Sequence, residues 1–154
     1  MGTLSEDAQR VVEEQRLCFV ATVNDDGTPN LSPKGTIAVL DDSHLAFCNI
    51  RSPGTIWNLR LRRAIEINVV DPIGRKGYRF KGTATIIEQG EPFTELVAFY
   101  RDRGTDLPIE SVVVIRVTNA DEVVSPAYDQ GLTEPEVRAR WRAHFAALEA
   151  VEQL

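Results

Sequence analysis

The sequence has few of the residues that build metal centres and disulfide frameworks. It contains two cysteines, Cys18 and Cys48, and two histidines, His44 and His144. Neither pair has the spacing of a zinc site or of a CxxC redox motif. We therefore expect no bound metal, and we interpret Cys18 and Cys48 as buried free thiols.

Long apolar runs and an excess of positive charge are also missing. No apolar run approaches the roughly 20 residues of a membrane-spanning helix, and the first residues, MGTLSEDAQR, lack a secretory apolar segment. The net charge of −6 argues against general nucleic-acid binding, because Lys and Arg contacts to phosphate dominate that affinity. We expect no nucleic-acid partner, no membrane partner and a cytoplasmic location.

The composition that remains is that of an ordinary folded domain. Of the 154 residues, 43% are hydrophobic and 26% are charged, and no internal repeat or low-complexity linker divides the chain. A chain of this length buries roughly two thirds of the surface that its unfolded form exposes. We interpret residues 1–154 as a single domain.

Periodicity predicts six strands and four helices. The apolar, β-branched runs that predict strands are 17–24, 31–41, 44–50, 64–71, 78–88 and 111–124. Helical spacing predicts helices at 5–16, 53–63, 91–104 and about 134–152. Strands in hairpin order with helices inserted between them predict a mainly β (α+β) protein, a six-stranded antiparallel barrel with flanking helices.

The last predicted helix has a clear start and an apolar face. Thr133 precedes Glu136 by three residues, which is the spacing of a capping box. Further along, a stripe of apolar side chains recurs at helical spacing: Val137, Trp141, Phe145 and Leu148. We expect this stripe to pack on the body of the protein or on a partner.

The stretch CNIRSPGTIWNLR (48–60) predicts a strand, a turn and the start of a helix. Ser52 before Pro53 is typical of a capped helix start, and the amides of Gly54 and Thr55 then point outward, as an anion requires. Thr55, Asn58 and Arg62 share one face of that helix. Arg51 lies just before the cap. The same pattern also fits an ordinary capped turn with solvated arginines.

A second stretch, NLSPKGTIAV (30–39), interrupts a strand with Pro33 and Gly35 on either side of Lys34. Proline cannot donate to a β-ladder and glycine weakens it, so we predict a bulge with free backbone groups. A flat ligand with hydrogen-bonding edges would use such groups. The alternative is an edge strand protected against aggregation.

These segments resemble a known family. The run from CFVATVNDDGTPNLSPKG through LAFCNIRSPGTIWNLRLRRAIEINVVD to YRFKGTATI is similar to the pyridoxamine 5'-phosphate oxidase-like proteins, over roughly residues 10–120. The resemblance implies the FMN-binding split-barrel fold, a homodimer, and one FMN in each of two clefts at the dimer interface. It implies cofactor contacts from two segments, at Ser32, Pro33, Lys34, Gly35, Cys48, Asn49, Ile50, Arg51, Ser52, Thr55 and Asn58.

The resemblance also has departures. The chain ends in the predicted helix and lacks the arginine-containing C-terminal segment of a true pyridoxamine-phosphate oxidase, so we do not expect vitamin B6 oxidation. Relatives that use deazaflavin often carry a basic groove, and Arg75, Lys76, Arg79 and Lys81 form either such a groove or a solvated loop. The SPAYDQG loop (125–131) places Tyr128 and Asp129 after the last strand, where they form either a simple turn or a contact to the partner's flavin.

The function that the resemblance implies is an FMN-dependent oxidoreductase acting on a small molecule. Lys34 is then expected beside the pyrimidine part of the ring, and Arg51 at the phosphate, with Arg62 as the second choice. A flavin-binding electron carrier or sensor, or a split barrel that uses deazaflavin or haem, remains the alternative.

Overall fold

The computed structural model describes residues 2–152, which form one sheet and four helices. The helices are α1 (Glu6–Gln15), α2 (Pro53–Leu61), α3 (Gly90–Asp102) and α4 (Glu134–Glu152). The strands are β1 (Cys18–Val23), β2 (Pro29–Lys34), β3 (Ala38–Val39), β4 (His44–Asn49), β5 (Ala64–Asp71), β6 (Lys76–Ile87) and β7 (Ser111–Val124). The α+β class and the place of each helix are confirmed, but the described residues form seven strands and not six.

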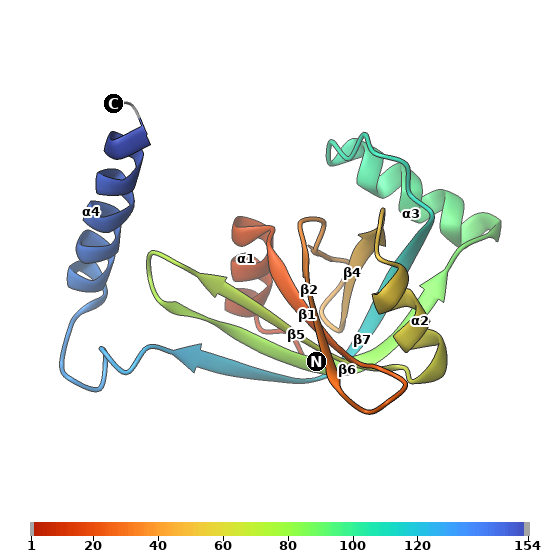
Figure 1. The fold of residues 1–154 in the computed structure, drawn as a ribbon, viewed down its shortest axis with the longest axis horizontal. Helices are drawn as coiled ribbons and strands as arrows, with labels where there is room; N and C mark the ends of the chain where they lie inside the picture. Colours follow the sequence, from red (N-terminus) through yellow and green to blue (C-terminus); the bar gives the residue numbers. More distant parts are fainter. Residues whose placement is uncertain (1, 153–154) are drawn as a thin grey trace.

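All seven strands belong to one curled antiparallel sheet, a half-barrel, in the order β2-β1-β5-β6-β7-β4-β3 (Figure 1). The two edge strands, β2 and β3, follow each other in the chain. Only residues 35–37 separate them. The chain itself therefore crosses from one edge of the sheet to the other.

The extra strand arises where residues 31–41 were expected to form one strand. Pro33 lies in regular register with Phe19, so the bulge predicted around Pro33 is wrong, while the edge-strand alternative is right. Proline costs little there because β2 pairs on one side only. The chain leaves the ladder one residue later, after Lys34, and re-enters the sheet as β3 against β4.

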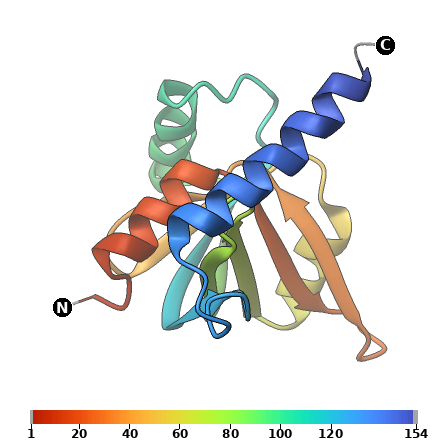
Figure 2. The same ribbon diagram turned by 90° about the vertical axis from the view of Figure 1, so that its left-hand side faces the viewer.

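The main core lies between the sheet and α1. Ala8, Val11 and Val12 of α1 belong to the same buried cluster as Val20 and Ile67 of the sheet. The Ser5 hydroxyl caps α1 by accepting a hydrogen bond from the Ala8 amide at 3.1 Å. Figure 2 shows α1 and α3 as separate helices on the body of the protein.

A second cluster forms where α3 packs on β4 and β7. This cluster contains Tyr100 of α3 together with Ala46, Cys48 and Val112. Because Leu45 and Phe47 belong to the main core instead, β4 is buried on both faces. The strand that leads into the predicted phosphate turn is therefore the most firmly enclosed part of the sheet.

Helix α4 stands away from the sheet and contacts the body mainly through its first turns (Figures 1 and 2). One of the two bonds of the predicted capping box is present, since the Thr133 amide donates to Glu136 Oε2 at 2.8 Å; the Thr133 hydroxyl donates to the same oxygen at 2.8 Å. Val137 is buried, but Phe145 and Leu148 are 37% and 53% exposed. Only the start of the expected apolar stripe therefore packs on the protein's own body.

None of the helices formed by residues 2–152 is both long and apolar enough to cross a bilayer.

Candidate functional site

The turn before α2 has the predicted shape but not the predicted cap. Ser52 has φ −139° and ψ 54°, and its side chain makes no capping hydrogen bond. The prediction that Ser52 caps the helix is therefore wrong. Instead, the Ser52 amide donates to Asn49 Oδ1 at 3.1 Å, which fixes the turn from the preceding strand.

The missing cap leaves donors free at the start of α2. The first helical hydrogen bond runs from the Ile56 amide to the Ser52 carbonyl at 3.1 Å. Within residues 2–152, the amides of Gly54 and Thr55 donate to no acceptor. Arg51 is exposed, and its guanidinium makes no ion pair or hydrogen bond with a described residue. Free amides beside an arginine are the arrangement that anions bind.

Asn58 of α2 and Arg62 both turn toward the β1–β2 hairpin, but Arg62 follows the helix end at Leu61 in extended backbone (φ −141°, ψ 117°), so the prediction that it shares a helical face with Thr55 and Asn58 is wrong. Thr55 and Asn58 are each 2% exposed. The Asn58 amide nitrogen donates to Thr22 Oγ1 at 3.0 Å and to Asn24 Oδ1 at 2.9 Å. Arg62 donates to the Asn24 carbonyl at 2.9 Å. Of the two arginines considered for the phosphate, Arg62 is thus already engaged, whereas Arg51 is free.

Lys34 occupies an unusual position at the end of β2. Its side chain turns inward, and the residue is 7% exposed. The ammonium donates to Ser32 Oγ and lies 5.9 Å from the centroid of the Phe47 ring. No described carboxylate forms an ion pair with it. Burial lowers the pKa of the Lys34 ammonium, against a smaller opposing effect of the Cys18 thiol.

The neighbouring positions divide between surface and interior. Pro33 and Gly35 are exposed at the sheet edge, and Ile50 is half-buried before the turn. The Cys48 amide donates to Thr36 Oγ1 at 2.8 Å, so β4 is tied to the segment that follows Lys34. This bond brings the two predicted segments into direct contact.

Both cysteines are buried, as predicted. Burial raises the pKa of the Cys18 thiol to about 12 and that of the Cys48 thiol to about 11. Both thiols are therefore protonated at neutral pH. A protonated thiol is a poor nucleophile and metal ligand, and the described residues contain no group of three or more His, Cys, Asp or Glu side chains placed to hold a metal ion.

A pocket of about 280 Å³ opens beside the start of α2. Asn49, 5% exposed, forms part of its wall and donates to Ser111 Oγ at 3.2 Å and to Glu110 Oε2 at 3.3 Å. Trp57 is 60% exposed on another wall. The remaining lining residues are Pro53, Ile56, Arg60, Glu88, Glu110 and Ser111.

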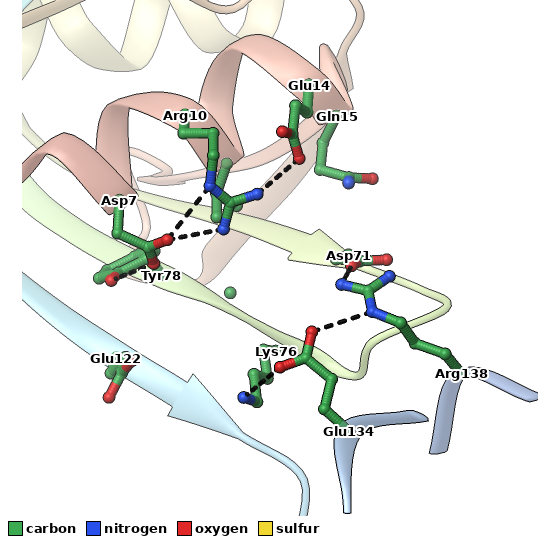
Figure 3. Close-up of a pocket in the computed structure, with 12 residues that line it drawn as sticks. Asp7, Arg10, Glu14, Gln15, Asp71, Lys76, Tyr78, Glu122, Glu134 and Arg138 are labelled. Carbon is green, nitrogen blue, oxygen red and sulfur yellow. Dashed lines mark hydrogen bonds and ion pairs between the residues drawn. The ribbon is translucent and has the colours of Figure 1, made fainter. Parts of the chain in front are cut away.

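A second pocket, of about 120 Å³, lies at the other end of the molecule between α1, the β5–β6 turn and α4 (Figure 3). Its charged side chains are mostly paired with each other. Arg138 bonds Asp71 at 2.7 Å and Glu134 at 2.9 Å, and Lys76 bonds Glu134 at 3.0 Å. These pairs attach α4 to the body, so this pocket is a structural junction.

The residues considered for a deazaflavin groove are largely occupied. The Arg75 guanidinium stacks 3.3 Å from the centroid of the Trp141 ring, Lys76 pairs with Glu134, and Arg79 pairs with Glu66 at 3.2 Å. Lys81 is exposed. Three of the four basic residues are thus already engaged within the protein.

The loop that follows β7 lies far from α2 within one chain. Tyr128 donates to the Gly74 carbonyl at 2.6 Å, at the β5–β6 turn. This turn and α2 lie at opposite ends of the molecule (Figure 1). The structure therefore does not bring Tyr128 and Asp129 together with the other predicted residues in a single chain.

Several residues around the site were not found from the sequence. Thr22 and Asn24 hold Asn58, Thr36 holds the Cys48 amide, and Ser111 holds Asn49. Thr36 directly follows the SPKG segment in the sequence, so its position in the chain could have indicated that it belongs to the site. Ser111 is far from Asn49 in the chain, and nothing in the local pattern of either residue links them.

Comparison with solved structures identifies similar folds. HupZ from group A Streptococcus is 29% identical, with a TM-score of 0.71, covering 79% of this chain and 95% of that one. An F420 reductase is 22% identical, with a TM-score of 0.62 and coverage of 77% and 98%. An FMN-binding protein from Syntrophomonas wolfei is 14% identical, with a TM-score of 0.66 and coverage of 78% and 86%. The last two show the fold alone.

Comparison with curated protein sequences gave no significant match. The profile of the family described as pyridoxamine 5'-phosphate oxidase matches residues 4–123, which include both predicted site segments. The half-barrel sheet agrees with the split-barrel fold that the resemblance implied. The chain therefore belongs to the pyridoxamine 5'-phosphate oxidase-like, FMN-binding split-barrel family.

Proposed function

We propose that this protein binds FMN and is an oxidoreductase that acts on a small molecule. The observation that carries the proposal is the buried residue Lys34, whose ammonium has no carboxylate partner among residues 2–152. A buried charge is costly unless it is paired. An electron-rich or anionic ligand edge next to Lys34 would supply the partner that the protein itself lacks.

The start of α2 provides a separate reason for a phosphate-bearing ligand. The free amides of Gly54 and Thr55 and the exposed Arg51 can hold a phosphate monoester together. Asn49 and Asn58 are held by fixed hydrogen bonds around this turn. The backbone donors of this turn are thus held in place before the ligand arrives, which lowers the entropic cost of binding.

When bound, FMN supplies a ring that accepts and returns a hydride or electrons. The residues of this chain orient that ring and set its electrostatic surroundings. Lys34 places positive charge where negative charge develops on reduction. Ser32 accepts a hydrogen bond from the Lys34 ammonium and so fixes the direction of that charge.

We also propose a homodimer. The outer face of the β1–β2 hairpin exposes Phe19, Val23 and Leu31 by 44%, 38% and 66%. Phe19 lies opposite Pro33, and Leu31 lies opposite Ala21. Contiguous exposed apolar side chains of this kind mark interaction sites, and a partner subunit would also bring a second set of loops to the flavin.

The proposal is tested with the purified, desalted protein. We expect the absorbance spectrum of a bound flavin, either in the protein as purified or after FMN has been added to it. Lys34→Met is expected to shift the flavin reduction potential by about 30–60 mV toward negative values, since one charge-assisted hydrogen bond is worth about 1.5–3 kcal/mol. Lys81→Met, at an exposed position on β6, is the matched control.

Each result has a distinct meaning. A colourless protein that fails to bind added FMN would contradict the cofactor assignment. A flavoprotein whose potential is unchanged in Lys34→Met would contradict only the role of Lys34. A turnover screen with reduced nicotinamides and candidate acceptors separates an oxidoreductase from an electron carrier or sensor, because only the former shows steady-state turnover.

A further inference from the structure

A pocket on the sheet, away from the predicted flavin segments, is lined by basic and hydroxyl-bearing side chains. It lies over β4, β7 and β6, beside the short connection between α2 and β5, and its volume is about 260 Å³. The lining residues are His44, Arg63, Thr83, Thr85, Val114 and Arg116. None of these six side chains is a carboxylate, and none belongs to the two segments assigned to FMN.

The register of the sheet brings these side chains together. Arg116 of β7 lies opposite Thr83 of β6 and opposite His44 of β4, so the three residues form one row across three strands. The chain neighbours Ala84 and Ile115 belong to the main core. Because successive side chains of a strand point to opposite faces, the row lies on the face of the sheet that is turned away from α1.

Arg116 brings an unpaired positive charge to this pocket. The residue is exposed, and its guanidinium makes no ion pair or hydrogen bond with any residue from 2 to 152. The chain has 23 acidic and 17 basic residues, so the lack of a carboxylate partner does not follow from the composition. All donors of the Arg116 guanidinium are therefore available to a ligand.

Arg63 is held at the pocket by uncharged groups. Its Nε donates to the Ala84 carbonyl at 2.8 Å, and its Nη2 donates to Thr85 Oγ1 at 2.5 Å. These two acceptors fix the direction of the guanidinium without cancelling its charge. Its Nη1 donates to no described residue, and the Thr83 hydroxyl likewise bonds to none of residues 2–152. The pocket thus has a second cation, which is already oriented, and a free hydroxyl.

The two guanidinium groups lack a counter-ion within the described chain. Like charges that line one pocket repel each other. The acid bonded to a lining residue is Asp41, whose carboxylate accepts a hydrogen bond from His44 Nδ1 at 2.9 Å and does not itself line the pocket. The charges of Arg63 and Arg116 are therefore not offset by a bonded carboxylate from residues 2–152, and a bound anion would supply the missing negative charge.

We propose that this pocket binds the phosphate group of a small phosphate monoester. At neutral pH such a group carries a charge of about −1.5 to −2 and several acceptor oxygens, which suit Arg63, Arg116 and the Thr83 hydroxyl. A cavity needs about 10–15 Å³ for each water-sized group, so the pocket has room for more than the phosphate. Val114, which packs against the α3 cluster, gives the organic part an apolar wall.

Titration of isotope-labelled protein with glycerol phosphate, followed by nuclear magnetic resonance, tests the proposal. We expect saturable shifts of the Nε–H signals of Arg63 and Arg116 and of the Thr83 amide. These shifts should saturate at lower concentration than with inorganic phosphate or succinate at equal ionic strength. The amide signals of Gly54 and Thr55 report separately on the turn before α2. Failure of the proposed FMN site would therefore leave the expectations for this pocket unchanged.

Two variants and a matched control complete the test, and the spectrum of each also shows whether it is folded. Arg116→Gln should weaken glycerol phosphate about tenfold or more, and Thr83→Val should weaken it less, because a neutral hydrogen bond is worth less than a charge-assisted one. Arg140→Gln, at an exposed position on α4, should bind as the wild type does. No saturable shift at Arg116, equal affinity in Arg116→Gln and wild type, or equally tight binding of inorganic phosphate or succinate would overturn the proposal.

Discussion

At the scale of residues, the turn between β4 and α2 shows how a missing hydrogen bond defines a candidate site. Ser52 leaves the helix start uncapped, and Asn49 fixes the turn instead. The amides of Gly54 and Thr55 remain free as a result. A side chain that capped the helix would compete with an anion for the same donors.

We predict that Arg51→Ala combined with Ser52→Ala weakens FMN far more than riboflavin. The two ligands differ by the phosphate, and each lost charge-assisted hydrogen bond costs about 1.5–3 kcal/mol, or about tenfold or more in affinity. Titration of both ligands by flavin fluorescence measures the difference. Equal weakening of FMN and riboflavin would mean that these residues do not contact the phosphate.

How much of this site was predictable depends on the kind of interaction. The segments around Lys34 and Arg51 were found because proline, glycine and serine in a strand or at a helix start have local physical consequences. The inward direction of Lys34 and the contact of Asn58 with Thr22 were not found. Both features depend on how segments that are distant in the chain pack together, and a local sequence pattern carries no information about that packing.

At the scale of elements, α4 shows how a helix is attached mainly by charged pairs. Burial alone would raise the pKa of Asp71, but hydrogen bonds from the Gly74 and Ile73 amides and from Arg138 outweigh it and leave the pKa lowered. Hydrogen bonds from Lys76 and Arg138 lower the pKa of Glu134. Both carboxylates therefore stabilise the attachment only while they are ionised.

We predict that acid detaches α4 before the sheet unfolds. A carboxyl group with a lowered pKa in the folded state contributes fully above its unfolded value, and this contribution is lost as the pH falls through the folded value. With ordinary values of 3.8 for Asp71 and 4.5 for Glu134, the attachment should hold at pH 5 and above, by our estimate, and weaken below about pH 4.

Fluorescence of Trp141 in a Trp57→Phe background measures this detachment, since the chain has two tryptophans. Arg138→Gln should move the transition to higher pH, because the carboxylates lose their cationic partner. Far-ultraviolet circular dichroism reports the sheet in the same samples. Simultaneous loss of both signals would show that α4 does not detach separately.

At the scale of the whole molecule, we consider two of the apolar surfaces that residues 2–152 leave uncovered. One is the outer face of the β1–β2 hairpin, with Phe19 and Leu31, and the other is the distal part of α4, with Phe145 and Leu148. The sequence predicted that the α4 stripe would pack on the body or on a partner. The body covers only its beginning, and packing of the rest on a partner stays a prediction.

We predict that the wild-type protein is a dimer in solution and that Leu31→Glu converts it to a monomer. A carboxylate at this position would have to lose its water in the interface without a partner. Leu107→Glu is the matched control, because Leu107 is similarly exposed, at 59% against 66% for Leu31, but lies between α3 and β7. Sedimentation analysis gives the answer; a monomeric wild type, or equal behaviour of the two variants, would contradict the prediction.

The short connection between the two edge strands also limits how far the half-barrel can open. Four residue steps separate Lys34 from Ala38, so their Cα atoms can lie at most roughly 14 Å apart. The gap between the two edge strands therefore has a maximum width, which is set by the length of the connecting chain and not by hydrogen bonds. Lengthening the connection would relax that limit. The space that the gap offers to the ring of the proposed flavin would then depend on the number of inserted residues.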